Sequence, residues 1–94
     1  MSAEITNNAA QNRYEIHLDG SLDGFAEYRL RGGRVIFTHT EIDPSSQGQG
    51  LGGKLARGAL DDVRATGRTV VPLCSFIKAY IDKHPEYAAI TDRR

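Results

Sequence analysis

The residues best suited to chemistry lie in one short stretch, QGQGLGGK, at positions 47–54. Four glycines, Gly48, Gly50, Gly52 and Gly53, fall within six positions there, directly before a segment of helical character. Glycine lets the main chain approach a ligand where a Cβ atom would collide, and backbone N–H groups at the start of a helix bind anions. The stretch therefore predicts a loop that binds phosphate groups.

Two common phosphate motifs fit this loop poorly. Gly48, Gly50 and Gly53 match the G-x-G-x-x-G dinucleotide fingerprint, but that motif directly follows a strand, and here the residues DPSSQ intervene. Gly48, Gly53 and Lys54 match the P-loop, yet Leu55 stands where a hydroxyl group must hold the metal ion. The sequence therefore favours neither a dinucleotide fold nor a nucleoside triphosphatase.

Three strands are predicted before the loop. RYEIHL (13–18) and FAEYRL (25–30) alternate apolar and polar residues with the period of a half-buried strand, and DGSLDG breaks the pattern between them. The two glycines of RGGR suit a tight hairpin turn. RVIFTHTEI (34–42) is rich in β-branched and aromatic residues, which predicts a central strand buried on both faces.

Two helices and one more strand are predicted after the loop. The segment 50–65 places Leu51, Leu55, Ala59 and Val63 four residues apart, which is the apolar stripe of a helix. RTVVPL reads as a short buried strand over 68–73, and SFIKAYIDKH as a second amphipathic helix with Phe76, Ile77, Tyr80 and Ile81 inward. The fold class is α+β with a mixed sheet: three antiparallel strands, a right-handed crossover helix, a parallel strand and a C-terminal helix.

Length and composition limit the classes of function. The chain has 94 residues, with 12 Lys and Arg against 12 Asp and Glu, so no excess positive field attracts nucleic acid or a membrane surface. Cys74 is the one cysteine, and neither a membrane span nor a signal peptide is visible, so a cytoplasmic protein is expected. No His, Cys and carboxylate cluster has metal-ligand spacing. Residues 1–12 read as a flexible N-terminus or frayed first strand, and 13–94 as one domain.

A third glycine pattern resembles a known superfamily. Gln47, Gly50 and Gly52 form Gln-x-x-Gly-x-Gly within HTEIDPSSQGQGLGGKLARGAL, and the block PLCSFIKAYIDKHPEY follows. With these two blocks the chain resembles the GNAT (Gcn5-related N-acetyltransferase) superfamily from residue 13 to residue 87, and within it the small single-domain YjdJ-type group. The resemblance implies an enzyme that uses acetyl-coenzyme A, as a co-substrate and without a metal, to acetylate an amine.

The resemblance also implies which residues bind coenzyme A. The backbone amides of the loop would hold the pyrophosphate, the backbone at the end of the third strand would pair with the pantetheine arm, and Lys54 could contact a phosphate. The positions concerned are Glu41, Ile42, Gln47, Gly48, Gln49, Gly50, Leu51, Gly52, Gly53 and Lys54.

Cys74 and His39 are the candidates for catalysis. Cys74 ends the fourth strand just before the second helix, where a helix N-terminus stabilises a thiolate, although free cysteines are often simply buried. By alternation, His39 shares a face with Val35, Phe37 and Glu41, and it could take the proton of Cys74, although a strand histidine is often structural. The resembled group places a His-Thr pair and a Cys-Ser pair at these positions. Glu41 is the alternative general base.

The acceptor stays open at this stage. Larger GNAT domains enclose the acceptor site with additional helices and strands, for which 94 residues leave no room. An open cleft, a homodimer or a macromolecular acceptor would each fit, so the amine is a small molecule or a protein and the chain a monomer or homodimer. A second function, a coenzyme A-binding or interaction module without turnover, needs the loop but neither Cys74 nor His39.

Overall fold

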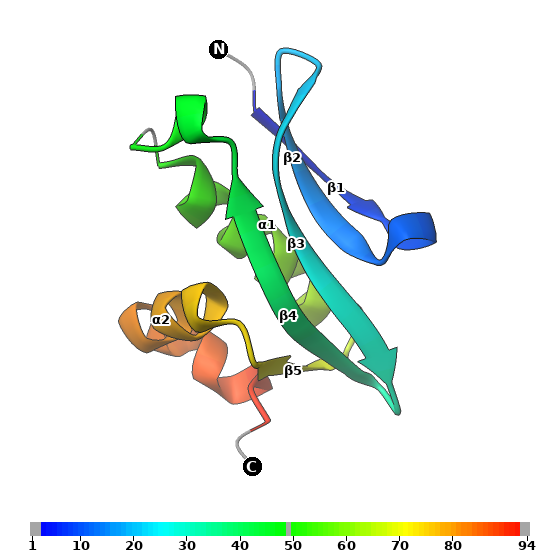
Figure 1. Cartoon of the computed structure of the whole chain (residues 1–94). Helices are drawn as coiled ribbons and strands as arrows, with labels where there is room; N and C mark the ends of the chain where they lie inside the picture. Colours follow the sequence, from blue (N-terminus) through cyan, green and yellow to red (C-terminus); the bar gives the residue numbers. More distant parts are fainter. Residues whose placement is uncertain (1–2, 49, 93–94) are drawn as a thin grey trace.

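The computed structural model describes residues 3–48 and 50–92 (Figure 1). The strands are β1 (Ala3–Asn8), β2 (Arg13–Leu18), β3 (Ser21–Arg31), β4 (Arg34–Ile42) and β5 (Thr69–Pro72), and the helices are α1 (Leu51–Ala65) and α2 (Ser75–Lys83). Short 3-10 helices follow β1, β4 and α2 as η1 (Ala9–Gln11), η2 (Pro44–Ser46) and η3 (Pro85–Ile90). Each predicted strand and helix is therefore present; β2 and β4 have the predicted bounds, and the other predicted elements differ at their ends.

The described strands form one mixed sheet in the order β1-β2-β3-β4-β5. The first four strands are antiparallel neighbours, and β5 pairs with β4 in parallel after the crossover through α1. This confirms the predicted α+β class and the succession of elements. Residues 3–8 pair with β2 along their whole length as β1, at one edge of the sheet.

Two-residue turns join β2 to β3 and β3 to β4. Gly32 and Gly33 both have positive φ, as the predicted hairpin at RGGR requires. Asp19 and Gly20 also have positive φ, so the first turn is equally short and β3 begins at Ser21, four residues earlier than predicted. The prediction was wrong there because an Asp-Gly turn needs only two residues, whereas the whole of DGSLDG had been assigned to the break.

The two helices pack on one side of the sheet around a single hydrophobic core. Leu51, Leu55, Ala59 and Val63 of α1 are all buried, which confirms the predicted stripe. Ile77 and Ile81 of α2 join the same cluster, but Phe76, expected to face inward, remains 40% exposed. Figure 1 shows α1 behind the sheet and α2 beside it toward the β5 edge.

A bulge in β4 changes which side chains face the helices. Tyr28 pairs with Phe37 but Glu27 pairs with His39, so Thr38 is an extra residue and the side-chain alternation reverses after it. Thr40 and Ile42 therefore lie on the helix side with Phe37, while His39 and Glu41 lie on the opposite, open face of the sheet. The prediction that His39 shares a face with Phe37 is wrong for this reason.

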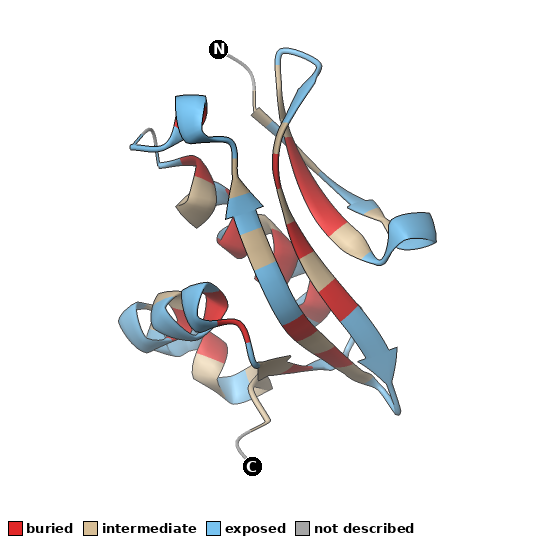
Figure 2. Ribbon diagram, viewed as in Figure 1, coloured by how far each residue is buried: buried red, intermediate tan, exposed pale blue. Residues whose placement is uncertain are grey.

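The second half of β4 is also more exposed than predicted. Val35 and Phe37 are buried, but Thr38, His39 and Glu41 are exposed, as the change of colour along β4 in Figure 2 shows. The strand is central, yet the expectation that both of its faces are buried is wrong, because no described element covers the open face.

Within the described residues, 3–48 and 50–92, no helix is long and apolar enough to cross a membrane.

Candidate active site

The glycine stretch forms the connection between η2 and α1. Asp43 begins η2 by accepting hydrogen bonds from the backbone N–H and the hydroxyl of Ser45, at 2.9 and 2.7 Å. Gly50 is the N-cap of α1, in the left-handed region with φ 73°, and provides no side-chain cap to the helix. The first turn of α1 also carries no acidic side chain. The N–H groups that open α1 are thus available to an anionic ligand.

Gly52 and Gly53, at the start of α1, differ in whether packing requires a glycine. A Cβ atom on Gly52 would lie 2.7 Å from the ring of Phe76, so glycine is needed there for α2 to approach. A Cβ atom on Gly53 would meet only Tyr80, at an ordinary 3.8 Å. Packing therefore accounts for glycine at position 52 and leaves the glycine at 53, which weakens the helix, without a packing reason.

A hollow of about 400 Å3 lies against this connection, and we call it the loop hollow. Its lining includes Thr40 and Ile42 from β4, Gln47 and Gly50 from the connection, Gly53 from α1, and Phe76 from α2. Gln47 donates a hydrogen bond to the carbonyl oxygen of Ile42 at 3.4 Å, which fastens the connection to the end of β4. The predicted residue Gln49 lies outside the described residues, and the exposed Lys54 is not among the lining residues.

Cys74 lies where the sequence predicted, between β5 and α2, but its partner is unexpected. It is the N-cap of α2 and is 8% exposed. Its backbone N–H donates to the carbonyl oxygen of Phe37 at 2.9 Å, and its Sγ–H donates to the hydroxyl of Thr40 at 3.2 Å. Thr40 lines the loop hollow, so the thiol is one hydroxyl group away from it.

His39 does not contact Cys74 among the described residues. Its Nε2 lies 3.1 Å from Oε1 of Glu41, and its ring lies 6.2 Å from the ring of Phe25, centroid to centroid, all on the open face of the sheet. Because His39 and Thr40 are consecutive strand residues, their side chains point to opposite faces of β4. The structure thus brings together Cys74 with Thr40, and His39 with Glu41.

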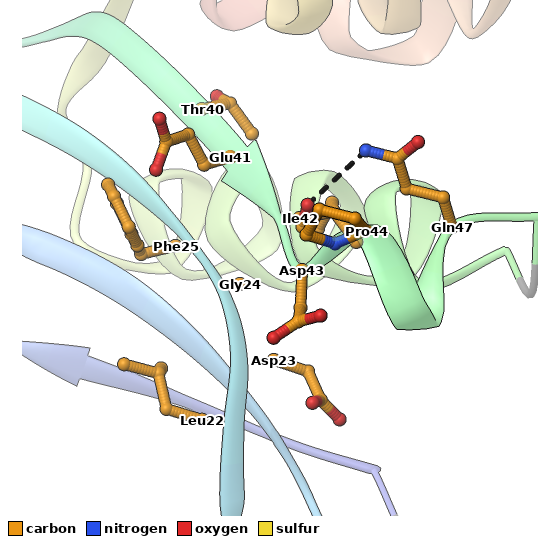
Figure 3. A pocket seen from close by; sticks show the side chains of 10 residues that line it. All are labelled: Leu22, Asp23, Gly24, Phe25, Thr40, Glu41, Ile42, Asp43, Pro44 and Gln47. Atoms are coloured by element: carbon orange, nitrogen blue, oxygen red, sulfur yellow. Dashed lines mark hydrogen bonds between the residues drawn. The ribbon is translucent and has the colours of Figure 1, made fainter.

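A second hollow, of about 620 Å3, lies between the start of β3 and the end of β4, and we call it the strand hollow (Figure 3). Asp23 and Phe25 contribute from β3, and Glu41 and Asp43 from the end of β4 and the turn after it. Thr40, Ile42 and Gln47 line both hollows, so these three residues form a shared wall. Sequence reasoning missed this hollow because it depends on strand register.

Hydrogen bonds fix the charge of two acidic groups on this side of the molecule. The hydroxyl and backbone N–H of Ser45 hold the pKa of Asp43 below its ordinary value. Burial would raise the pKa of Glu15, but hydrogen bonds from Asn8 and Arg13, at 3.0 and 2.6 Å, outweigh it and keep that pKa low. Both groups are therefore ionised at neutral pH. Among the described residues, no group of His, Cys and carboxylates is arranged to hold a metal ion.

Comparison with known proteins identifies the family. The model of the GCN5-related N-acetyl-transferase family matches residues 13–90. The chain belongs to this family. A search of curated proteins gives no significant match.

Solved structures show the same fold. A GCN5-like protein from Staphylococcus aureus superposes with a TM-score of 0.73 at 22% identity, over 97% of this chain and 89% of that one. The ribosomal-protein-S18-alanine N-acetyltransferase of Escherichia coli gives 0.58 at 22% identity, over 62% of this chain and 38% of that one. N-acetylglutamate synthase of Neisseria gonorrhoeae, solved with coenzyme A and N-acetyl-glutamate, superposes with a TM-score of 0.62 at 18% identity. The match covers 78% of this chain and 18% of that one.

Proposed function

We propose that this protein is an N-acetyltransferase that binds acetyl-coenzyme A in the loop hollow and transfers the acetyl group to an amine. One observation carries the proposal: in a chain of the GCN5-related family, the uncapped N-terminus of α1 opens beside a hollow lined by glycines. Pyrophosphate binding requires several N–H donors that point to one place, with no side chain in between.

The residues of the loop hollow fit coenzyme A. The amides of residues 48–53 would hold the pyrophosphate, because a Cβ atom on Gly48 or Gly50 would meet nothing within 4 Å and the space above the backbone is open. The backbone of Glu41 and Ile42 would pair with the pantetheine arm. Gln47 keeps the loop at a fixed distance from that strand end through its hydrogen bond to Ile42. Lys54, at the fourth position of α1, would add positive charge near the phosphates.

Acetyl-coenzyme A supplies the acetyl group as a thioester, and two routes from it are compatible with the geometry. In the first, the Cys74 sulfur takes the acetyl group, the coenzyme A sulfur leaves with the proton that Cys74 loses, and the amine then attacks the Cys74 thioester. Thr40 would position the thiol through the hydrogen bond at 3.2 Å. In the second, the amine attacks acetyl-coenzyme A directly, and the His39–Glu41 pair takes the proton that the amine must lose.

Binding at the loop is tested by two substitutions at Gly53. Gly53→Asp places a carboxylate in the first turn of α1, where it favours the helix but repels a bound pyrophosphate. Gly53→Ala adds only the Cβ atom, for which there is room. In calorimetric titrations with coenzyme A, we expect Gly53→Asp to weaken binding by about tenfold or more, and Gly53→Ala, which adds no charge, to weaken it less than Gly53→Asp does.

Other results of that titration would contradict the proposal. If coenzyme A does not bind the native chain at millimolar concentration, the proposed function fails. If Gly53→Asp folds and binds coenzyme A as tightly as Gly53→Ala, the ligand lies elsewhere and the assignment of the loop fails.

A further inference from the structure

The strand hollow is a second cavity, distinct from the loop hollow to which the pyrophosphate of coenzyme A is assigned. It is larger than the loop hollow, at about 620 against 400 Å3, and lies across the shared wall of Thr40, Ile42 and Gln47. A substrate in the strand hollow would therefore be separated from a ligand in the loop hollow only by the end of β4. This is the arrangement that a transfer between two substrates requires.

The lining of the strand hollow has a definite charge. Among its described lining residues, Asp23, Glu41 and Asp43 are acidic and none is Lys, Arg or His. Asp43 donates its backbone N–H to the carbonyl oxygen of Asp23 at 2.7 Å, which keeps these two residues adjacent. Neither carboxylate forms an ion pair with a described residue. Two adjacent carboxylates that lack a positive partner attract a cation.

The hollow also has an apolar part. Leu22 is a large apolar residue that is 43% exposed, and it lines the hollow together with Phe25. Figure 3 shows Leu22 and Phe25 on β3, with the carboxylates of Asp23 and Asp43 to one side of them and that of Glu41 beside Phe25. A ligand with an aliphatic stem between two charged ends would place its stem on Leu22 and Phe25.

We infer that the strand hollow is the acceptor site and that it selects an aliphatic amine with a second positive charge, an inference that rests on the proposed acetyl transfer. The nitrogen that reacts must be neutral to attack the carbonyl carbon, so it loses its proton to the Glu41–His39 pair, in which the two side chains are 3.1 Å apart. That nitrogen then forms the amide bond as the thioester C–S bond breaks. Asp23 and Asp43 are left to bind the nitrogen that stays protonated.

The bulge at Thr38 makes this arrangement possible. Without the extra residue, His39 and Glu41 would continue the alternation of Val35 and Phe37 and would face the helices. With it, they face the side of β4 that carries Phe25, while Thr40 turns toward Cys74. The bulge thus assigns the two pairs to the two sides of the strand, with Glu41–His39 at the acceptor and Thr40–Cys74 toward the donor.

Amine binding can be tested without turnover. The native chain with coenzyme A bound is titrated with diaminobutane and with butylamine, which have equal carbon chains but two charges and one, and amide resonances are followed by nuclear magnetic resonance. We expect shifts at Gly24, Phe25 and Ile42, and an affinity for diaminobutane about fivefold higher than for butylamine. Asp23→Asn should remove that preference. Asp82→Asn, an equal change of charge on α2, should leave it intact.

The outcomes separate this inference from the proposed function. Equal affinities for the two amines, shifts confined to other regions, or a preference that survives in Asp23→Asn would overturn the acceptor site. If coenzyme A itself does not bind, the proposed function fails, and the preference of the free protein for diaminobutane still decides whether the strand hollow takes a dication.

Discussion

Thr40 is the residue that most changes the interpretation of the sequence. The candidate pair was Cys74 and His39, but the thiol donates its hydrogen bond to the Thr40 hydroxyl, and His39 lies beside Glu41. A hydroxyl next to a thiol orients the sulfur but is too weak a base to take its proton at neutral pH. In the covalent route Cys74 would therefore be a nucleophile that Thr40 orients, and in either route the proposed His39–Glu41 base would act on the amine.

Glu15 is a buried acid whose role is stability. It is 7% exposed and accepts a hydrogen bond from Asn8, which links β1 to β2, and another from Arg13 of its own strand. We expect Glu15→Gln to lower the free energy of unfolding at pH 7 by about 1 to 2 kcal/mol, because a charged acceptor is replaced by a neutral one. Chemical denaturation monitored by circular dichroism would measure the loss.

The pH dependence of that loss follows from the lowered pKa of Glu15. A carboxylate with a lowered pKa in the folded state stabilises the protein fully above its unfolded pKa of about 4.3, and this contribution disappears as the pH falls through the folded pKa. The difference between native protein and Glu15→Gln should therefore shrink in this acidic range. Glu27→Gln, on the neighbouring strand, is the control. A difference that stays constant down to pH 3 would contradict the assignment.

At the scale of elements, α1 is fitted to β1 through a glycine. A Cβ atom on Gly58 would lie 2.8 and 2.9 Å from two side-chain carbons of Ile5, and 3.2 Å from its Cβ atom, so β1 would have to move. We expect Gly58→Ala to lower the free energy of unfolding by about 1 to 3 kcal/mol, despite the better helix propensity of alanine.

Gly53→Ala is the matched control in the same helix. It gains the same propensity without a clash, and we expect it to raise the free energy of unfolding by about 0.5 to 1 kcal/mol. Thermal or chemical unfolding of both variants, with Gly58→Ala/Ile5→Ala as a third, would show whether removing the Ile5 side chain relieves the cost. If Gly58→Ala is as stable as Gly53→Ala, the packing of β1 on α1 is not as described.

The succession of elements could be predicted from sequence, but the strand faces could not. The order of strands and helices, the RGGR turn and the stripe of α1 all depend on neighbouring residues, and each was confirmed. The bulges at Asp23 and Thr38 are single extra residues that appear only when a strand is paired with its neighbour. Local alternation therefore placed His39 on the wrong face, whereas the glycine stretch lies directly before α1, as its composition predicted.

At the scale of the whole molecule, the end of β4 divides two hollows with different chemistry. One opens on glycines and the start of α1, and the other on carboxylates and exposed apolar side chains. With the proposed assignments, a small chain of this family would have its donor side and its acceptor side on the two sides of one strand end. The proposed acceptor amine is an aliphatic dication, which a hollow with acidic and without basic lining residues would attract.

The most direct test of the proposed acetyl transfer is mass spectrometry of the amine after incubation with acetyl-coenzyme A and the purified chain. We predict formation of acetylated diaminobutane well above the rate without protein, and loss of most of that activity in Gly53→Asp. The covalent route further predicts an acetylated protein that is absent in Cys74→Ala, whereas the direct route predicts unmodified protein and loss of activity in Glu41→Gln. If no amine, including butylamine and a lysine peptide, is acetylated above background, the protein is not an acetyltransferase and the central claim is wrong.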